Sequence, residues 1–162
     1  MEQHDVDTEL AAARELLDST SAGHLAYTAE DGTPRVVTVG FFWTGEQFVT
    51  STAATAPKVA ALSARPDVAL AVDAGGRPEQ ARALSVRGRA DIRIVEGVVE
   101  EYLAAARRSM DAEPAAQFAQ NCRALYDRMA RIAITPRWVR YYDFGAGRVP
   151  RFLQELAERS GR

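Results

Sequence analysis

Three β-rich runs follow one another in the first third of the chain, and tight turns separate them. The runs span residues 23–29, 34–44 and 47–51, and the turn signals between them are Glu30-Asp31-Gly32-Thr33 and Gly45-Glu46. Connections this short join antiparallel neighbours, because a parallel pair needs a crossover of a dozen or more residues. The chain is therefore predicted to begin as an antiparallel meander, which argues against a doubly wound parallel sheet.

Three more strands are predicted at 68–73, 83–95 and 137–144. Gly88 inside the second of these predicts a bulge or a close backbone approach. Helical patterns are expected at 7–18, 57–64, a helical insertion at about 96–133, and a C-terminal helix at about 149–160.

Together these elements predict one domain over residues 1–162, mainly β with flanking helices (α+β), built as a six-stranded antiparallel barrel, closed or split. The interior of so small a barrel is filled by side chains. A ligand is therefore expected outside it, at a sheet edge or a subunit interface.

The composition excludes several classes of function. A net charge of −2 and 47% hydrophobic residues give no signal for nucleic acid or an anionic membrane. No apolar run approaches the roughly 20 residues of a membrane span, and the acidic opening Met1–Asp5 does not look like a secretory signal. A lone cysteine, Cys122, excludes an internal disulfide framework and fits a reducing cytoplasm. We expect a soluble cytoplasmic protein.

Residues for metal binding or nucleophilic catalysis are sparse. The chain has two histidines, His4 and His24, and one cysteine, whereas zinc needs three or four ligands at suitable spacing. No nucleophile-elbow pattern accompanies a serine. Cys122 is expected to be a packed thiol on a helical stripe of apolar residues, namely Phe118, Cys122, Leu125, Met129 and Ile132.

The segment 48–58 leaves the third strand, crosses a hydroxyl-rich turn and enters a short helix with Pro57 in its first turn. Lys58, the only lysine among 20 basic residues, follows Thr50, Ser51, Thr52 and Thr55. Hydroxyls, backbone N–H groups at a helix start and an ammonium are what a phosphate needs. The residues alone leave two alternatives, a phosphate ligand or a solvated surface lysine.

The last predicted strand is rich in aromatic residues. Strand alternation places Trp138, Arg140 and Tyr142 on one face, with Val139 and Tyr141 on the other. Core or dimer packing would explain the aromatic rings. Arg140 beside Trp138 would place an anion-binding guanidinium at an aromatic surface, and Arg35 at the start of the second strand is another candidate phosphate ligand.

Several segments in order resemble one known family. They are the Ala22–Thr28 run, the Asp31–Val39 run, the Ser51–Lys58 loop followed by Pro66-Asp67-Val68, the Leu84–Ala90 run and the Ile134–Val139 segment. Over residues 10 to 145 the chain is similar to the pyridoxamine 5′-phosphate oxidase-like, FMN-binding split-barrel superfamily, in particular its flavin/deazaflavin oxidoreductase branch. The resemblance implies a split barrel and a homodimer with two cofactors at the subunit interface.

The resemblance also implies cofactor-binding residues. The second-strand segment Arg35, Val36, Val37 and Thr38 would line the cofactor. The third-strand end Thr50, Ser51 and Thr52 would meet the ribityl phosphate, and Lys58 would pair with that phosphate. Trp138 and Arg140 of the partner subunit would close over the ring.

The implied function is a flavin-dependent oxidoreductase acting on a small organic substrate, with FMN as cofactor. Alternatives are a reductase that uses the deazaflavin coenzyme F-420, or a non-enzymatic flavin- or haem-binding protein with His24 as the axial ligand. The alanine-rich loop around a single Lys58 favours FMN, because F-420 has a long anionic tail. No catalytic side chain is identified, although Tyr27, Tyr141 or a water would serve as proton donor. The chain is shorter than the vitamin-making oxidases and shows no basic and histidine set for pyridoxal phosphate, which argues against that activity.

Overall fold

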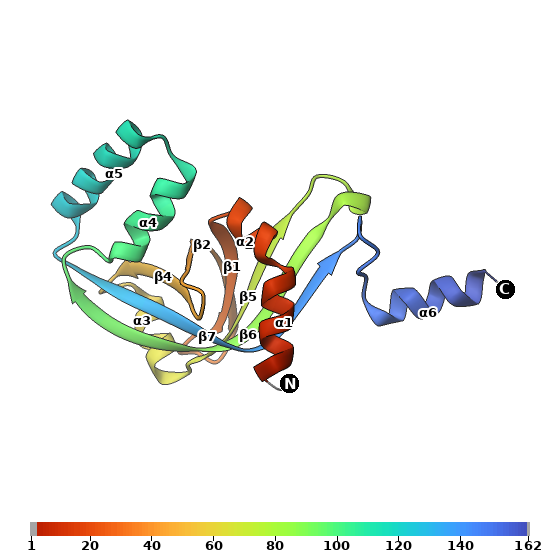
Figure 1. Ribbon diagram of the computed structural model, residues 1–162. Helices are drawn as coiled ribbons and strands as arrows, with labels where there is room; N and C mark the ends of the chain where they lie inside the picture. The colour runs from red at the N-terminus through yellow and green to blue at the C-terminus, as the bar shows by residue number, and fades with distance from the viewer. Residues whose placement is uncertain (1–2, 162) are drawn as a thin grey trace.

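The computed structural model describes residues 3–161, and its centre is a seven-stranded antiparallel sheet from which the C-terminal helix projects away (Figure 1). The strands in this part of the chain are β1 (Ala22–Thr28), β2 (Pro34–Gly40), β3 (Phe42–Trp43), β4 (Phe48–Ala53), β5 (Asp67–Ala74), β6 (Arg82–Glu96) and β7 (Arg128–Asp143). The helices are α1 (Gln3–Ala12), α2 (Arg14–Ser19), α3 (Pro57–Ala64), the 3₁₀ turn η1 (Pro78–Gln80), α4 (Glu100–Ser109), α5 (Ala112–Leu125) and α6 (Arg151–Ser160). No described helix is both long enough and apolar enough to span a bilayer.

The sheet curls into a barrel that hydrogen bonds do not close. Its strand order is β2-β1-β5-β6-β7-β4-β3, so β2 and β3 lie at opposite ends of the order although only Phe41 separates them in sequence. The α+β class and the antiparallel barrel are confirmed. Seven strands replace the predicted six because the run 34–44 breaks at Phe41, whose ring is buried in the core, into β2 and β3.

A stretch of strand edge is left without a strand partner where the curled sheet meets itself. β3 pairs only with Phe48 and Val49 of β4, and β2 pairs only with β1. Among residues 3–161, Thr50–Ala53 of β4 therefore has a ladder partner on one side alone, which is β7. β2 and β4 nevertheless come into contact across this gap. We call the line where β2 faces Thr50–Ala53 the open seam.

The barrel interior is packed with the inward side chains of alternating strand residues. β5 buries every second residue, and β6 does so from Leu84 to Ala90. The helices α1 to α3 add residues to the same core, including Leu16, Leu17 and Leu62. Because these side chains fill the interior, it has no room for a cofactor, as the size of the barrel predicted.

The predicted helical insertion is wrong at its C-terminal end. The structure ends α5 at Leu125 and begins β7 at Arg128, so Met129 and Ile132 belong to a strand and Leu125 is exposed. From Met129 to Ile134 this strand is buried on both faces except at Arg131. A strand buried on both faces loses its alternation and mimics the end of a helical stripe. Cys122 does lie buried against Leu103 and Ala119, and burial raises the pKa of its thiol.

Helix α1 covers the edge of β7 that β4 does not reach. The Tyr141 backbone N–H donates to Glu9 Oε2 at 2.7 Å, and Arg148 Nη2 donates to Glu9 Oε1 at 2.6 Å. Arg148 Nε also donates to the Tyr141 carbonyl at 2.8 Å. The Glu9 carboxylate thus replaces a missing strand as acceptor, which protects an otherwise open sheet edge.

Gly88 marks a bulge, as predicted. The register of β6 against β7 shifts between Arg87 and Gly88, so that Arg87 faces Trp138 while Gly88 faces Pro136. A Cβ atom on Gly88 would lie 2.5 Å from the Thr135 carbonyl oxygen. Since that neighbour is backbone, only a glycine lets the two long strands approach so closely.

We expect Gly88→Ala to destabilise the protein by about 1–3 kcal/mol, the usual cost of overpacking against an immovable neighbour. The measurement is the urea midpoint of unfolding. Gly76→Ala is the matched control, because a Cβ there meets nothing within 4 Å and its φ is not positive. Equal midpoints for the Gly88 variant and the wild type would contradict this expectation, because they would show that β6 and β7 can move apart enough to accommodate a Cβ atom.

Candidate functional site

The two predicted cofactor-binding segments lie on opposite sides of the open seam. Arg35 to Thr38 occupy β2, and Thr50 to Thr52 occupy the part of β4 that pairs with β7 alone. The sequence places them 12 or more residues apart, and the curling of the sheet brings their strands into contact. Backbone groups on both edges are thus directed toward the seam, where a ligand or a partner chain could pair with them.

The hydroxyl side chains of β4 divide between its two faces. Thr50 and Thr52 share one face, and Thr50 is buried, 5% exposed. Ser51 points to the opposite face, in register with Arg131 of β7. Its Oγ atom is buried without a hydrogen-bond partner among the described residues. An unpaired buried hydroxyl is costly, so Ser51 is a polar group that a ligand would satisfy.

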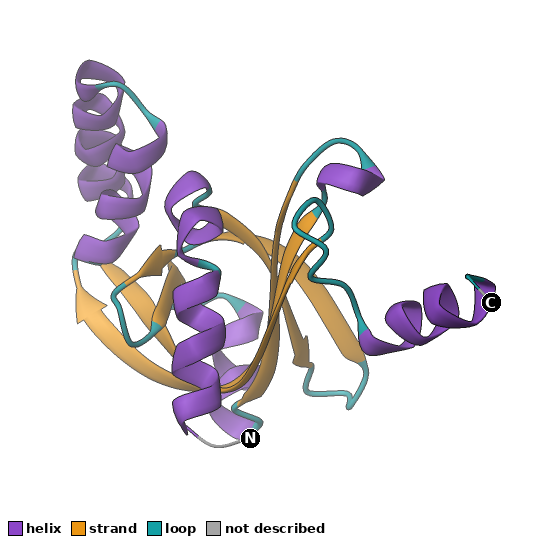
Figure 2. Cartoon of the chain, turned by 45° about the vertical axis from the view of Figure 1, so that its right-hand side comes forward, coloured by secondary structure: helices purple, strands orange, loops and turns teal. Residues whose placement is uncertain are grey.

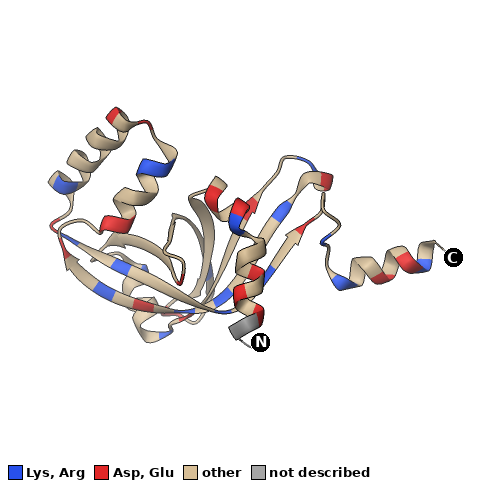
Figure 3. Cartoon of the chain, viewed as in Figure 1, with Lys and Arg blue, Asp and Glu red and all other residues tan. Residues whose placement is uncertain are grey.

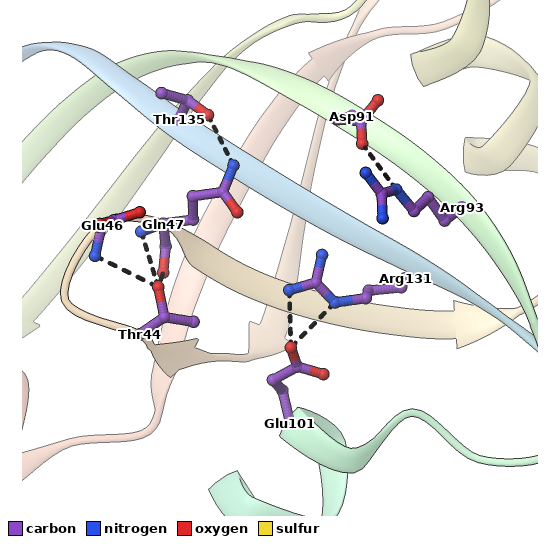
Figure 4. Close-up of polar contacts among 8 residues, drawn as sticks. All are labelled: Thr44, Glu46, Gln47, Asp91, Arg93, Glu101, Arg131 and Thr135. Atoms are coloured by element: carbon purple, nitrogen blue, oxygen red, sulfur yellow. Dashed lines mark hydrogen bonds and ion pairs between the residues drawn. The ribbon is translucent and has the colours of Figure 1, made fainter.

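Arg131 is held beside this strand by an ion pair (Figure 4). Its Nε and Nη2 atoms donate to Glu101 Oε1 of α4 at 2.9 and 2.6 Å, and both side chains are about three-quarters buried. The hydrogen bonds from Arg131 lower the pKa of the Glu101 carboxyl. The pair fixes α4 over the face of β4 that carries Ser51. Sequence reasoning missed Arg131 because it assigned residue 131 to a helix.

Lys58 is the second residue of α3, directly after Pro57. The helix begins at Pro57 without a side-chain cap at Ala56, so its first N–H groups have no side-chain acceptor there. Lys58 is half-buried and forms no ion pair within the described chain. An uncapped helix start with an adjacent ammonium retains the capacity for a phosphate that the sequence suggested.

Arg35 is already engaged at the tip of the β1–β2 hairpin. Its Nη2 atom lies 3.0 Å from Asp31 Oδ2, and its Nη1 atom donates to Thr33 Oγ1. Hydrogen bonds from the Thr33 hydroxyl and N–H, with a smaller contribution from Arg35, lower the pKa of Asp31 to about 2. The Arg35 guanidinium would have to exchange this carboxylate for a cofactor phosphate, whereas Lys58 would not.

Trp138 lies far from the seam within one chain. The strand registers align it through Arg87, Ala69 and Ala26 with Val36 of β2, on the same outer face of the sheet. Four strand spacings of about 4.8 Å make a path of about 19 Å along the curled sheet. A single chain therefore does not bring Trp138 to the β2 segment, and only a second chain could.

The outer face of β2, β1, β5, β6 and β7 is unusually open. Val36 is 66% exposed, and Ala69 and Ala71 are exposed on β5. The Arg87 guanidinium stacks 4.3 Å from the centre of the Trp138 ring, and Arg140 lies 5.9 Å from it, so the predicted neighbourhood of Trp138 and Arg140 is observed. Arg140 also approaches Glu9 at 3.5 Å. Arg87 was missed, although alternation within β6 placed it on this face.

The remaining candidates have structural partners. Tyr141 is buried, its hydroxyl donates to Asp143 Oδ2 at 3.2 Å, and burial together with that carboxylate raises its pKa, so it is neutral near pH 7. His24 lies on the outer face, 3.4 Å from Asp73. The side chain of His4 is outside the described residues. Residues 3–161 contain no group of three or more metal-ligating side chains.

A family model described as "Pyridoxamine 5′-phosphate oxidase" matches residues 10–143. The chain belongs to this family. The match covers nearly all of the sheet and both predicted cofactor segments, which confirms the resemblance drawn from the sequence.

Several solved structures share this fold. An F-420 reductase is 31% identical, covering 78% of this chain and 94% of its own, with a TM-score of 0.59. A conserved hypothetical protein of Mycobacterium tuberculosis is 18% identical, covering 93% and 89%, with a TM-score of 0.64. The haem storage protein of Vibrio cholerae is 16% identical, covering 81% and 92%, with a TM-score of 0.58. A comparison with curated protein sequences finds no significant match.

We expect Glu101→Gln to lower the free energy of unfolding by about 1–2 kcal/mol at neutral pH, because a charge-assisted hydrogen bond pair is lost. Glu101 has a lowered pKa when folded, so its contribution is present above its ordinary pKa and is lost as the pH falls through the lowered value. The gap between variant and wild type should therefore shrink below about pH 4.

Urea unfolding at pH 7 and at pH 3.5 measures both effects. Glu100→Gln is the matched control, because its exposed side chain lies in the same helical turn and forms no ion pair in the described part of the chain. A Glu101→Gln deficit that is equal at both pH values would contradict the role of the carboxylate.

Proposed function

We propose that the protein is a homodimeric oxidoreductase of small organic substrates that holds a flavin-type cofactor, FMN, at the open seam. The observation that carries the proposal is the buried, unpartnered Ser51 Oγ in the strand that leads to the uncapped helix start at Lys58. Membership of the oxidase family supports it. The seam residues fit a phosphate-bearing group, because they offer hydroxyl donors, helix N–H groups and an ammonium together.

The exposed outer face supports the proposed dimer. β5 is the middle strand of the five that form it, so a two-fold axis along β5 would pack the face of one copy against the same face of the other. That axis would set the partner's β7 opposite β2. It would bring the partner's Trp138 and Arg140 close to β2. Within one chain, four strand spacings, roughly 19 Å along the sheet, separate β7 from β2. The site would then be shared by two subunits.

Each group has a distinct role in this arrangement. Lys58 and the first N–H groups of α3 would hold the phosphate, and Ser51 and Thr52 would donate to the ribityl chain or the phosphate. Thr50, whose side chain is buried on the core side, would contribute its backbone at the seam. The backbone of Arg35 to Thr38 would lie along the ring system. The bound cofactor would supply hydride transfer, while the protein supplies orientation and excludes water.

The 31% identical F-420 reductase favours a second candidate, a reductase that uses coenzyme F-420. The charges of the β4–α3 segment support FMN, because Lys58 is the one cation between Thr50 and Ala64 while Arg35 and Arg131 are bound to carboxylates. Haem binding has less support, since His24 lies on the outer face beside Asp73. We place the protein in the cytoplasm because its one cysteine is a buried thiol.

Lys58→Ala should weaken cofactor binding by about 1.5–3 kcal/mol, roughly tenfold to 150-fold, as expected for loss of a charge-assisted contact. Titration of the protein with FMN and, separately, with F-420 measures this change and shows which cofactor binds. Arg93→Ala is the control, because it removes an exposed cation that pairs with Asp91 on β6. A wild-type protein that binds neither cofactor would refute the proposal, and unchanged affinity in the lysine variant would remove Lys58 from the site.

A further inference from the structure

Helix α6 has an apolar stripe that the rest of its chain leaves uncovered. The helix buries none of its residues and projects away from the sheet in both views (Figures 1 and 2). Phe152 is 61% exposed and Leu156 is 53% exposed, and Leu153 lies on the same side of the helix. A ten-residue helix is marginal in water by itself, so this stripe needs a partner surface.

A groove of matching character lies between α1 and the β3–β4 turn. It consists of two adjoining hollows of about 440 and 490 Å³ that share Asp7, Leu10, Trp43 and Gly45. It is lined both by the apolar residues Leu10, Ala11 and Trp43, which we call its floor, and by the acidic residues Asp7, Asp18 and Glu46, which we call its rim. We call it the α1–β3 groove. Arg14 also lines it but is paired with Asp18 at 3.8 Å.

The charges of α6 suit this groove. Arg159 follows Phe152 by seven residues, two helical turns, so it continues the apolar stripe, whereas Glu158 lies on the far side. Arg159 forms no ion pair within the described chain. Figure 3 shows acidic residues along α1 and both signs of charge on α6. The other hollow between helices, under α4 and α5, is lined by Arg107 and Arg123, which would repel Arg159.

We propose that α6 of one copy of the chain occupies the α1–β3 groove of a second copy. The occupant is an amphipathic helix laid into a groove, with Phe152 and Leu156 on the floor and Arg159 at the acidic rim. The exchange is reciprocal in a two-fold dimer, because each copy carries both the helix and the groove.

The groove of the same chain is not the site for α6. Glu9 is two residues from both Asp7 and Ala11, about 200° around α1, so it lies on the side opposite the groove. Glu9 binds Arg148 at 2.6 Å, and this contact anchors the start of the α6 segment on that opposite side. To reach its own groove, α6 would have to pass over α1.

The second copy brings α6 within reach, and this step alone depends on the dimer proposed above. The carboxyl end of β7 lies level with Gly40 of β2. Across the sheet, Tyr142 faces Ala83, Ala83 faces Asp73, and the register of β5 with β1 continues this row to Ala22, which faces Gly40. A two-fold axis along β5 keeps that level, so the partner's β7 ends beside Gly40. Trp43 of the groove follows Gly40 by three residues.

The test is disulfide trapping between two differently tagged chains, one carrying Ala11→Cys and the other Leu156→Cys. Both positions are exposed, and Cys122 is buried. We expect a disulfide that joins the two tags under mild oxidation. Ala116→Cys, in the hollow beside α5, replaces Ala11→Cys as the control and should trap little. No disulfide, preferential trapping at Ala116, or an intrachain disulfide in a single chain that carries both Ala11→Cys and Leu156→Cys would overturn the proposal.

The stripe itself is tested by the rate of trapping. Phe152→Ser in the Leu156→Cys chain should lower the initial rate at least about tenfold, the loss expected for one buried aromatic side chain. Glu158→Ser on the far side of α6 should leave the rate unchanged. The fold of each chain should be unchanged in both serine variants, because α6 buries none of its residues in its own chain. Equal rates for the two serine variants would contradict docking through the stripe.

The outcome is separable from the proposed cofactor function. Trapping in protein that binds neither FMN nor F-420 would support the docking while refuting the function. Failure to trap in a protein that binds FMN would refute the docking alone.

Discussion

The structure depends on strand pairing that stops short of closing the barrel. β3 reaches only the first two residues of β4, and β2 has a partner on one side, so two strand edges face each other without a ladder between them. Backbone groups left this way are costly when buried and prone to pair with other chains when exposed. The other open edge, on β7, is covered by Glu9 of α1. The seam is the edge to which a ligand and a second subunit can contribute.

Because side chains fill the core, a ligand can bind only at the surface of the barrel. The hydroxyls, the ammonium and the unpartnered Ser51 gather at the β4 side of the seam, whereas Trp138 and Arg140 lie further along β7, six residues or more beyond Ile132, which pairs with Thr50. Neither set makes a complete site alone. An open outer face and an unpartnered α6 supply two surfaces by which two chains could join them. Cofactor binding would then require the dimer, because the site would take residues from both subunits.

The sequence predicted those features that local chemistry determines. Short turns identified the meander, the bulge at Gly88 was visible as a glycine inside a strand, and the ordered motifs identified the family. The start of β7 was missed because the chain there is buried on both faces and lacks alternation. Arg131 was lost with it, and the pairing of Arg35 with Asp31 depends on side-chain geometry. Once β4 is known to be a strand, its alternation predicts that Thr50 and Ser51 lie on opposite faces.

Whether the seam holds a flavin-type cofactor is measured by the absorption spectrum and mass of the ligand that the purified protein carries or takes up. We expect a yellow protein that releases FMN on denaturation, at one cofactor for each subunit of a dimer. F-420 in its place would retain the seam as the site and change the identity of the cofactor. A colourless protein that binds neither FMN nor F-420, or one that shows only a Soret band with haem, would contradict the account.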